Sequence, residues 1–300
     1  MILSCGFDCN WAAMNADKFW EKNLILRMIS GSRAYGLARA DSDEDTRGVC
    51  IPPKQHLLGL HRFEQYESEN HDHTIFALDK FIRLALAANP NIIEMLYTDS
   101  RFILFMNPYG ERLLQARDMF LSRRVGESFS RYAISQLHRM ENHHRWLIHP
   151  PEHKPVPQDF GGRPYGGRYR FPHSDAERDY QAAFKHWNHY QAWRKNRNPT
   201  RAGLEARYGY DTKHAMHLFR LLKMGEEILR TGKVNVLRSD ADWLLQIRDG
   251  ALGYEEIIRL AAEHEENLTA LIEHSNLPSE PDTPAVETLL IELQETFLFP

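Results

Sequence analysis

The chain has 300 residues, of which 42% are hydrophobic and 26% are charged, and its formal net charge is -4. A chain of this length buries a sizeable core without disulfides or structural metals, which excludes the small stapled classes of protein. No apolar run approaches the roughly 20 residues that a membrane helix needs, so we expect a soluble protein without a membrane partner.

The first residues lack the basic and apolar regions of a secretory signal, so a cytoplasmic location is expected. The cysteines at positions 5, 9 and 50 form no Cys-x-x-Cys pair, and we expect ordinary thiols.

The first third of the chain alternates strand and helix patterns. Residues 23–30 (NLILRMIS) are an apolar run of strand length that stops at Gly31, which predicts a buried strand entering a glycine turn. TRGVCIPP, at 46–53, predicts a short strand ended by prolines, and residues 63–76 predict one strand or two, interrupted near Asn70. Helical spacing begins near Ala77, and IIEMLYT at 92–98 predicts a second short helix.

After residue 106 the apolar residues recur at helical spacing in four segments, 109–121, 127–147, 174–195 and 211–232. Ser174, with Glu177 three residues later, has the pattern of a helix N-cap. Residues 149–173 are rich in Pro, Gly and charge and predict a long mobile loop. The expected fold class is α+β, with a mixed-sheet domain at 1–112 and a mainly helical domain at 113–300.

An acidic run follows the first predicted strand. Asp41, Asp43 and Asp45 alternate, so in an extended backbone their carboxylates project from one face, where they suit a hard cation such as Mg²⁺. A calcium-binding EF-hand starting at Asp41 would need Gly and Glu where the chain has Thr46 and Pro52, so that type of loop is excluded. A solvated acidic turn is the alternative.

Gly31 and Ser32 end the same strand and suggest an anion-binding turn. Glycine lets backbone N–H groups approach anionic oxygens, and serine adds a hydroxyl donor. The Walker pattern is missing, because no Gly-Lys-Ser/Thr follows, and GSRAYG does not fit the dinucleotide fingerprint. A phosphate held here is therefore held in another way.

A strand, then Gly-Ser, then Asp-x-Asp resembles the signature of the DNA polymerase beta superfamily of nucleotidyltransferases. GSRAYGL at 31–37 and SDEDTRGV at 42–49 are similar to one subgroup of predicted nucleotidyltransferases, some of them linked to RNA repair and RNA ligases. The resemblance extends to NPNIIEMLYT at 89–98 and to RYGYDTKHAMHLFRLL at 207–222, so it reaches both halves of the chain.

The resemblance implies roles for particular residues. Asp43 and Asp45 match the pair that binds Mg²⁺ or Mn²⁺, Gly31 and Ser32 match the loop that holds the terminal phosphates, and Asp41 would be a bystander. A third carboxylate comes from a neighbouring strand. Asp72 is our choice, because it is expected at the end of an extended segment just before a helix.

Glu67 and Glu69 remain open alternatives for the third carboxylate, as does the interpretation of Asp72 as an exposed turn cap.

Several basic residues are further candidates for contacts with a nucleotide. Arg33 and Arg47 flank the predicted pocket, where a guanidinium would give bidentate donors to a triphosphate. Lys213, His217 and Arg220 share one helix face and His214 lies beside them, in a segment, 185–223, whose nine Lys or Arg and two acids give a local charge of +7. We expect Lys213, His214 and Arg220 to contact the nucleotide, although an amphipathic helix also produces such a face.

Two further patterns concern other ligands. Aromatic residues interleave with the basic segment (Phe184, Trp187, Tyr190, Trp193, Tyr208 and Tyr210), as in proteins that bind single-stranded RNA, but a helical core stripe explains the same spacing. The histidine-rich run at 138–153 lacks the ligand separations of zinc motifs, so no metal is expected from it.

The sequence thus predicts a Mg²⁺-dependent transfer of a nucleoside monophosphate from an NTP to an acceptor hydroxyl, with an RNA 3′ end as the acceptor and pyrophosphate as the product. Modification of a protein or small molecule, and an inactive nucleotide-binding regulatory protein, are the alternatives. The choice of NTP and the oligomeric state stay open.

Overall fold

A computed structural model describes residues 18–40, 42–197 and 199–299 of the chain. Asp41, Cys5 and Cys9 lie outside the described residues.

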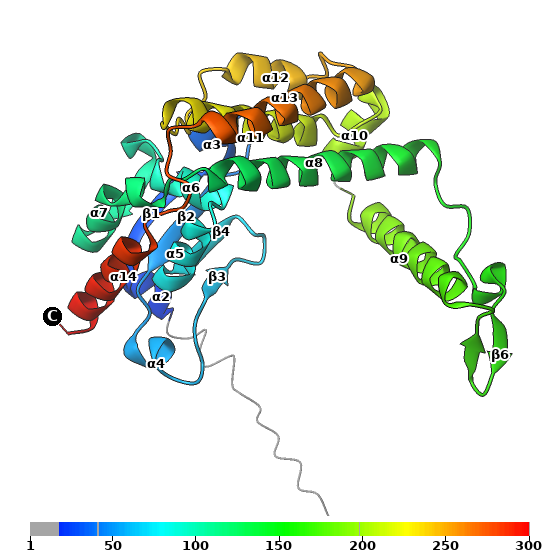
Figure 1. Cartoon of the computed structure of the whole chain (residues 1–300), viewed down its shortest axis with the longest axis horizontal. Helices are drawn as coiled ribbons and strands as arrows, with labels where there is room; N and C mark the ends of the chain where they lie inside the picture. The colour runs from blue at the N-terminus through cyan, green and yellow to red at the C-terminus, as the bar shows by residue number, and fades with distance from the viewer. Residues whose placement is uncertain (1–17, 41, 198, 300) are drawn as a thin grey trace, which may run out of the picture. The chain divides into compact units, whose positions relative to one another are not determined.

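The fold is α+β, as expected, with a five-stranded mixed sheet in the N-terminal part and mostly helices after it (Figure 1). The strand order is β3-β4-β2-β1-β5; β2 and β4 are parallel and the other neighbours are antiparallel. The sheet strands are β1 (Leu24–Ser30), β2 (Asp45–Cys50), β3 (Gln65–Glu67), β4 (His73–Ala77) and β5 (Ile103–Met106).

The hydrophobic pattern explains the centre of this sheet. β1 is buried at Ile25, Leu26 and Met28, which fits the continuous apolar run that predicted it. The segment expected as one or two strands contains β3 and β4, and the interruption near Asn70 is confirmed.

Helices cover the sheet and complete the core. α5 follows β4 directly and buries Leu78, Phe81 and Ile82. In α6 the side chain of Asn89 caps the first turn by accepting the N–H of Asn91 at 3.0 Å. α14, near the C-terminus, packs against α5 and α7 (Figure 1).

The described helices have the following bounds: α2 (Phe19–Lys22), α3 (Gly31–Tyr35), α4 (Lys54–Leu57), α5 (Leu78–Leu86), α6 (Pro90–Leu96), α7 (Pro108–Gln115), α8 (Arg124–Ile148), α9 (Ser174–Asn196), α10 (Pro199–Tyr208), α11 (Thr212–Thr231), α12 (Ala241–Arg248), α13 (Tyr254–His274) and α14 (Thr283–Leu298). Short 3₁₀ helices are η1 (Ser100–Phe102), η2 (Arg117–Phe120) and η3 (Pro157–Phe160).

The described residues form two compact units. The first contains the residues up to Tyr132, Arg220–Leu245 and the residues from Glu263 onward, while the second contains Ala133–Phe219 and Gln246–Ala262. Helices α8, α11, α12 and α13 therefore contribute residues to both units. The described residues of the expected catalytic domain, 1–112, belong to the first unit, and the boundary of that domain stays a prediction.

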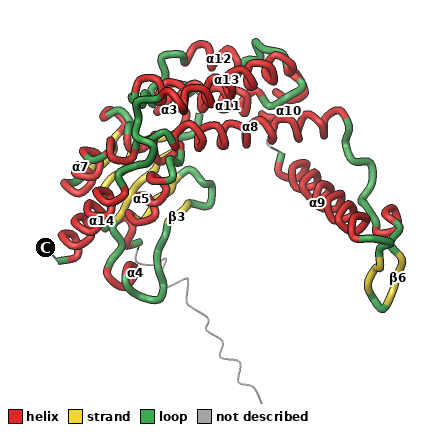
Figure 2. The backbone as a smooth tube through the Cα atoms, viewed as in Figure 1, coloured by secondary structure: helices red, strands yellow, loops and turns green. Residues whose placement is uncertain are grey.

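The segment expected as a long loop, 149–173, contains η3 and a two-stranded hairpin of β6 (Arg163–Tyr165) and β7 (Arg168–Arg170), the strands at the lower right of Figure 2. The predicted helix after it is α9, but its N-cap is His173 and not Ser174. The ring nitrogen Nδ1 of His173 accepts the N–H of Ala176 at 3.1 Å, so the histidine takes the role that the serine pattern suggested.

Within the part of the chain that the structure describes, every helix is too short or too polar to cross a lipid bilayer.

Candidate functional site

Three chain segments meet at one edge of the sheet. Ser30, the last residue of β1, pairs with Asp45, the first residue of β2. The start of β4 lies beside the start of β2, because Thr46 pairs with His73 in the parallel register. The N–H of Thr46 donates to the carbonyl oxygen of Asp72 at 2.8 Å. Because the end of β1 and the beginnings of β2 and β4 lie side by side, the backbone of Asp72 lies close to that of Asp45.

Gly31 lies directly beneath the carboxylate of Asp45. A Cβ added at Gly31 would overlap Oδ2 of Asp45, and the backbone there has φ +67°, a conformation that favours glycine. Glycine suits this position for two reasons: the backbone has a positive φ, and the Asp45 carboxylate lies where a Cβ would be. The predicted partnership of the glycine turn and the acidic run has this contact as its physical basis.

Arg33 organises the loop that carries Asp43. Its guanidinium donates to the carbonyl oxygen of Ser42 at 3.1 Å, and its Nε lies 3.9 Å from Oε2 of Glu44. These partners are the residues on either side of Asp43, which is exposed. The contacts of Arg33 position the acidic loop, while its predicted contact with a nucleotide stays a prediction.

A small cavity opens beside this turn. Its lining includes Ser30, Gly31 and Arg47. The hydroxyl of Ser30 is buried and has no hydrogen-bond partner among the described residues. An unsatisfied buried hydroxyl costs about 1–3 kcal/mol, so its position beside Gly31 suits a bound polar group.

A buried ion pair supports the turn from within the first unit. The phenol of Tyr35 donates to Oε2 of Glu94 at 2.5 Å, and Nη1 of Arg220 donates to Oε1 of the same carboxylate. The guanidinium carbon of Arg220 lies 3.9 Å from the ring centre of Tyr35. Burial raises the pKa of Tyr35, so the phenol keeps its proton and acts as a donor.

The third acid differs from expectation in its local setting. Asp72 precedes the extended segment β4, although we expected it at the end of one, because the turn 68–72 returns the chain to this edge. Asn70 donates its side-chain N–H to Oδ2 of Asp72 at 2.5 Å. Glu67 is exposed and pairs with His71 at 2.8 Å, and Glu69 is exposed. Of Asp72, Glu67 and Glu69, it is Asp72 whose backbone is hydrogen-bonded to Thr46, the residue after Asp45.

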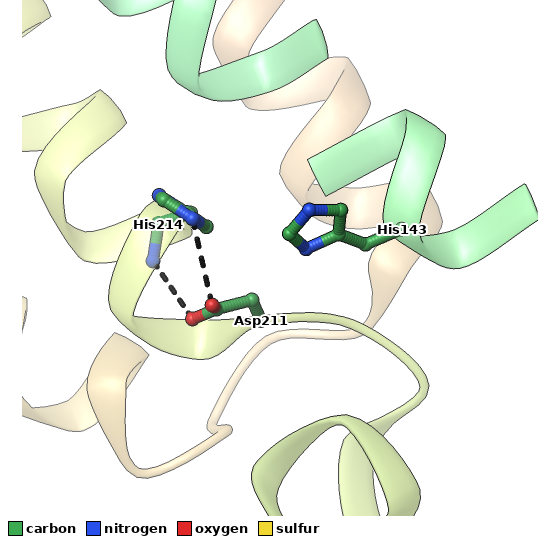
Figure 3. A group of neighbouring side chains, drawn as sticks. All are labelled: His143, Asp211 and His214. Carbon is green, nitrogen blue, oxygen red and sulfur yellow. Dashed lines mark hydrogen bonds and ion pairs between the residues drawn. The ribbon is translucent and has the colours of Figure 1, made fainter. Parts of the chain in front are cut away.

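The side chains of the three predicted metal ligands do not form a compact group. Among the described residues, one group of three or more acidic, His or Cys side chains has all its ligand atoms within 4.8 Å of one another, and it consists of His143, Asp211 and His214 (Figure 3). The aspartates 43, 45 and 72 share the sheet edge without meeting that distance. Their joint role as metal ligands stays a prediction.

The basic residues predicted on α11 have separate surroundings. Lys213 is half-buried and His214 is buried, both in the second unit, and their N–H groups donate to Oδ1 of Asp211 at 2.9 and 3.1 Å. Arg220 belongs to the first unit, where it pairs with Glu94. Sequence reasoning gave no role to Tyr35, Ser30 or Glu94, although a single acid inside the apolar helix pattern of NPNIIEML was a signal for a buried carboxylate.

The Glu94–Arg220 pair gives a stability prediction. Arg220→Met leaves the Glu94 carboxylate buried without its cation and should lower the free energy of unfolding by about 3–5 kcal/mol. Adding Glu94→Leu should restore much of that loss. Denaturant unfolding followed by circular dichroism measures both effects.

The matched control for this prediction is Arg112→Met, which removes the half-exposed partner of Glu292 and should cost at most about 1 kcal/mol. Equal losses for Arg112→Met and Arg220→Met would contradict the importance of the buried pair.

Comparison with known proteins adds one finding. The model of the family described as RlaP, the RNA repair pathway DNA polymerase beta family, matches residues 12–292. No curated protein and no solved structure matches the chain. The match covers most of the chain, including the glycine turn, the acidic loop and both units, and it confirms the resemblance on which the site assignments depend. The chain therefore belongs to the RNA repair pathway DNA polymerase beta family, a family of polymerase beta-like nucleotidyltransferases.

Proposed function

We propose that the chain transfers a nucleoside monophosphate from an NTP to the 3′ hydroxyl of an RNA and releases pyrophosphate. The observation that carries this proposal is the closeness of the Asp45 carboxylate to the glycine turn, with Asp72 just before the adjacent strand β4 and Asp43 two residues before Asp45. In our proposal the turn binds the phosphates and the acidic side chains beside it bind the metal.

The residues at this edge suit a hard divalent cation, Mg²⁺ or Mn²⁺. Their side chains offer carboxylate oxygens, which such ions prefer to nitrogen or sulfur. Asp43, Asp45 and Asp72 would hold the metal, and Gly31 leaves room for a carboxylate beside the backbone. When bound, the ions neutralise charge on the triphosphate and on the attacking oxygen.

The proposed reaction is an in-line displacement at the α-phosphorus. The acceptor oxygen forms a bond to that phosphorus, the bond to the oxygen shared with the β-phosphate breaks, and pyrophosphate leaves. Asp72 takes the proton of the acceptor hydroxyl. Gly31 and Ser32 hold the terminal phosphates, and Arg47, on the strand that begins at Asp45, adds a cation for the triphosphate.

RNA is favoured as the acceptor by the family description and by the hairpin β6–β7. Three arginines and two tyrosines crowd its six strand residues (Arg163, Tyr165, Arg168, Tyr169 and Arg170). Tyr165 and Tyr169 are 71% and 46% exposed, and the guanidinium of Arg170 lies 6.0 Å from the ring centre of Tyr165. Exposed rings between cations bind single-stranded nucleic acid by stacking and phosphate contacts.

The aromatic residues of α9 have a different environment from those of the hairpin. Tyr190 is buried, and the rings of Trp146 and Trp193 lie 5.9 Å from its ring. Phe184, Trp187 and Trp193 are half-buried, so the core-stripe interpretation fits Tyr190 best, and the more exposed rings of the hairpin are the better candidates for the RNA contact.

The central test measures transfer of label from each α-labelled NTP, with Mg²⁺, to RNA, to protein and to small acceptors. Asp43→Asn and Asp45→Asn should each lower the rate at least about a hundredfold, because losing one group that stabilises transition-state charge costs roughly 10²–10³ in rate. The control Asp99→Asn changes a half-exposed acid that caps η1, where Asn caps equally well, and should keep the wild-type rate.

Two outcomes of this assay would contradict the proposal. Label on a protein or small molecule but not on RNA would overturn the assigned acceptor. Equal labelling by wild type and Asp45→Asn, or none with any acceptor, would overturn the assigned reaction.

A glycine pair tests the contact beneath Asp45. Gly31→Ala and Gly232→Ala introduce a methyl group at nearly the same φ, +67° and +68°, but only the first meets the carboxylate, since the nearest atom to the second is a leucine methyl at 3.9 Å. The backbone cost should therefore be similar, and the transfer rate should fall at least tenfold more for Gly31→Ala. Thermal unfolding and transfer rates are measured side by side, and equal rates would contradict the role of the contact.

The hairpin gives a binding prediction. Tyr165→Ala with Arg168→Ala should weaken single-stranded RNA binding tenfold or more, because stacking of one base on a ring contributes about 1–3 kcal/mol. The matched double variant Phe299→Ala with Lys54→Ala removes another exposed ring and its cation, 5.0 Å apart, and should leave the affinity unchanged. Fluorescence anisotropy with a labelled oligonucleotide measures both, and equal affinities would exclude the hairpin as the RNA contact.

A further inference from the structure

A second group of side chains, wholly within the second unit, has the composition of a metal site. His143 comes from α8, Asp211 immediately precedes the first residue of α11 and His214 lies in its first turn (Figure 3). One ligand atom from each lies within 4.8 Å of the other two. Asp211 is fully buried, His214 is 6% exposed, and the side chain of His143 is 18% exposed.

Both histidine rings are oriented by a second partner through the same nitrogen. Nδ1 of His143 lies 3.1 Å from Oε1 of Glu205, and Nδ1 of His214 lies 2.8 Å from Oε1 of Gln136. Since these oxygens are acceptors, each Nδ1 is the donor, and Nε2 is the ring nitrogen that remains to bind a metal. Histidines that bind metals characteristically donate their other N–H to a carboxylate or carbonyl oxygen in this way.

The partner of His143 is itself held firmly. Glu205 is buried, and Arg197 donates to its Oε2 from Nε at 2.8 Å and from Nη2 at 2.6 Å. The guanidinium balances the charge of Glu205, so this carboxylate serves to orient the imidazole of His143.

Asp211 offers one oxygen toward the histidines. Its Oδ1 accepts the N–H groups of Lys213 and His214, which fixes the carboxylate at the start of the helix. Its Oδ2 lies 3.5 Å from Nε2 of His214. The fully buried carboxylate and the two imidazole rings together form a ligand set of the kind that binds a divalent cation.

We propose that His143 Nε2, His214 Nε2 and Asp211 Oδ2 bind a divalent transition metal, with a water as the fourth ligand. Zinc is the ion that we expect. Imidazole and carboxylate ligands suit zinc, whereas magnesium prefers oxygen alone. Ligands about 2.0–2.1 Å from a tetrahedral ion stand roughly 3.3 Å apart, so the group must contract by up to about 1.5 Å on binding. The residues assigned above to nucleotidyl transfer all belong to the first unit, so this site shares none of them.

The proposal gives His214 a metal ligand's role in place of the predicted nucleotide contact. In this proposal the ligand spacing within the histidine-rich run at 138–153 gave no sign of a metal site because the other two ligands, Asp211 and His214, lie outside the run.

The experiment titrates zinc into the purified full-length chain, without an affinity tag and stripped by a chelator, in competition with a chromophoric chelator. One equivalent should bind with a dissociation constant below about 1 μM, and mass spectrometry of the native protein should show one zinc. His143→Gln and His214→Gln should each weaken binding at least a hundredfold. Gln136→Met, which removes only the orienting partner, should weaken it about 10- to 100-fold.

The matched control is His144→Gln. His144 is adjacent on the same helix, but its Nδ1 donates to the carbonyl oxygen of Gly209 at 2.6 Å and its ring stacks on Tyr254, so zinc affinity should be unchanged. Circular dichroism without metal establishes whether each variant folds. If the ligand variants do not fold, cobalt binding to the wild type decides: one equivalent should give the intense visible absorption of tetrahedral coordination.

Two results would overturn the proposal. The first is the lack of any site tighter than about 10 μM in the stripped wild type, or a cobalt spectrum of weak octahedral type. The second is a one-equivalent site that survives in folded His143→Gln and His214→Gln, which would mean chelation by other histidines among the 16 in the chain. Neither result bears on label transfer, which is measured separately.

Discussion

The contact between the Asp45 carboxylate and the backbone at Gly31 is the constraint on which the site in the first unit depends. Gly31 has φ +67°, which favours glycine, and a Cβ there would displace the Asp45 carboxylate that the pairing of Ser30 with Asp45 brings close. The same register places Thr46 beside Asp72 through the parallel strand pair. A backbone that presents N–H groups and carboxylates at a single edge therefore follows from strand pairing, before any ligand is considered.

The turn that carries this contact is fixed by residues distant in the sequence. Glu94 is an acid inside a helix whose other residues are mostly buried and apolar, and it is compensated by a phenol and a guanidinium. The guanidinium comes from Arg220, and the N–H of Arg238 donates to the carbonyl oxygen of Tyr35 at 3.1 Å. The segment 220–245 is thus part of the unit that contains the sheet, which agrees with a family match that extends over both halves of the chain.

Local patterns predicted most elements of this fold, and long-range pairing accounts for the differences. The apolar run before Gly31 and the helical spacing after Ala77 are local signals, and the structure has a strand and a helix there. The Ser174 pattern was wrong by one residue because a histidine ring also accepts the N–H of a helix turn. The setting of Asp72 was misjudged, since a turn and a strand end look alike in a polar stretch. That Arg220 meets Glu94, and His143 meets Asp211, depends on packing between segments more than 60 residues apart, which periodicity cannot reveal.

The parallel pairing of β2 and β4 separates the acids from the segment that joins the strands. The chain leaves β2 at Cys50, at the end of the strand far from Asp45, and must travel back along the sheet before Asp72. The base of this connection is held by packing, since the rings of His56 and Phe63 lie 4.5 and 5.0 Å from the ring of Phe19. Its tip carries the exposed Leu58 and Leu60, so we expect insertions at the tip to leave both acids in place, because the strand pairing fixes where β2 and β4 begin.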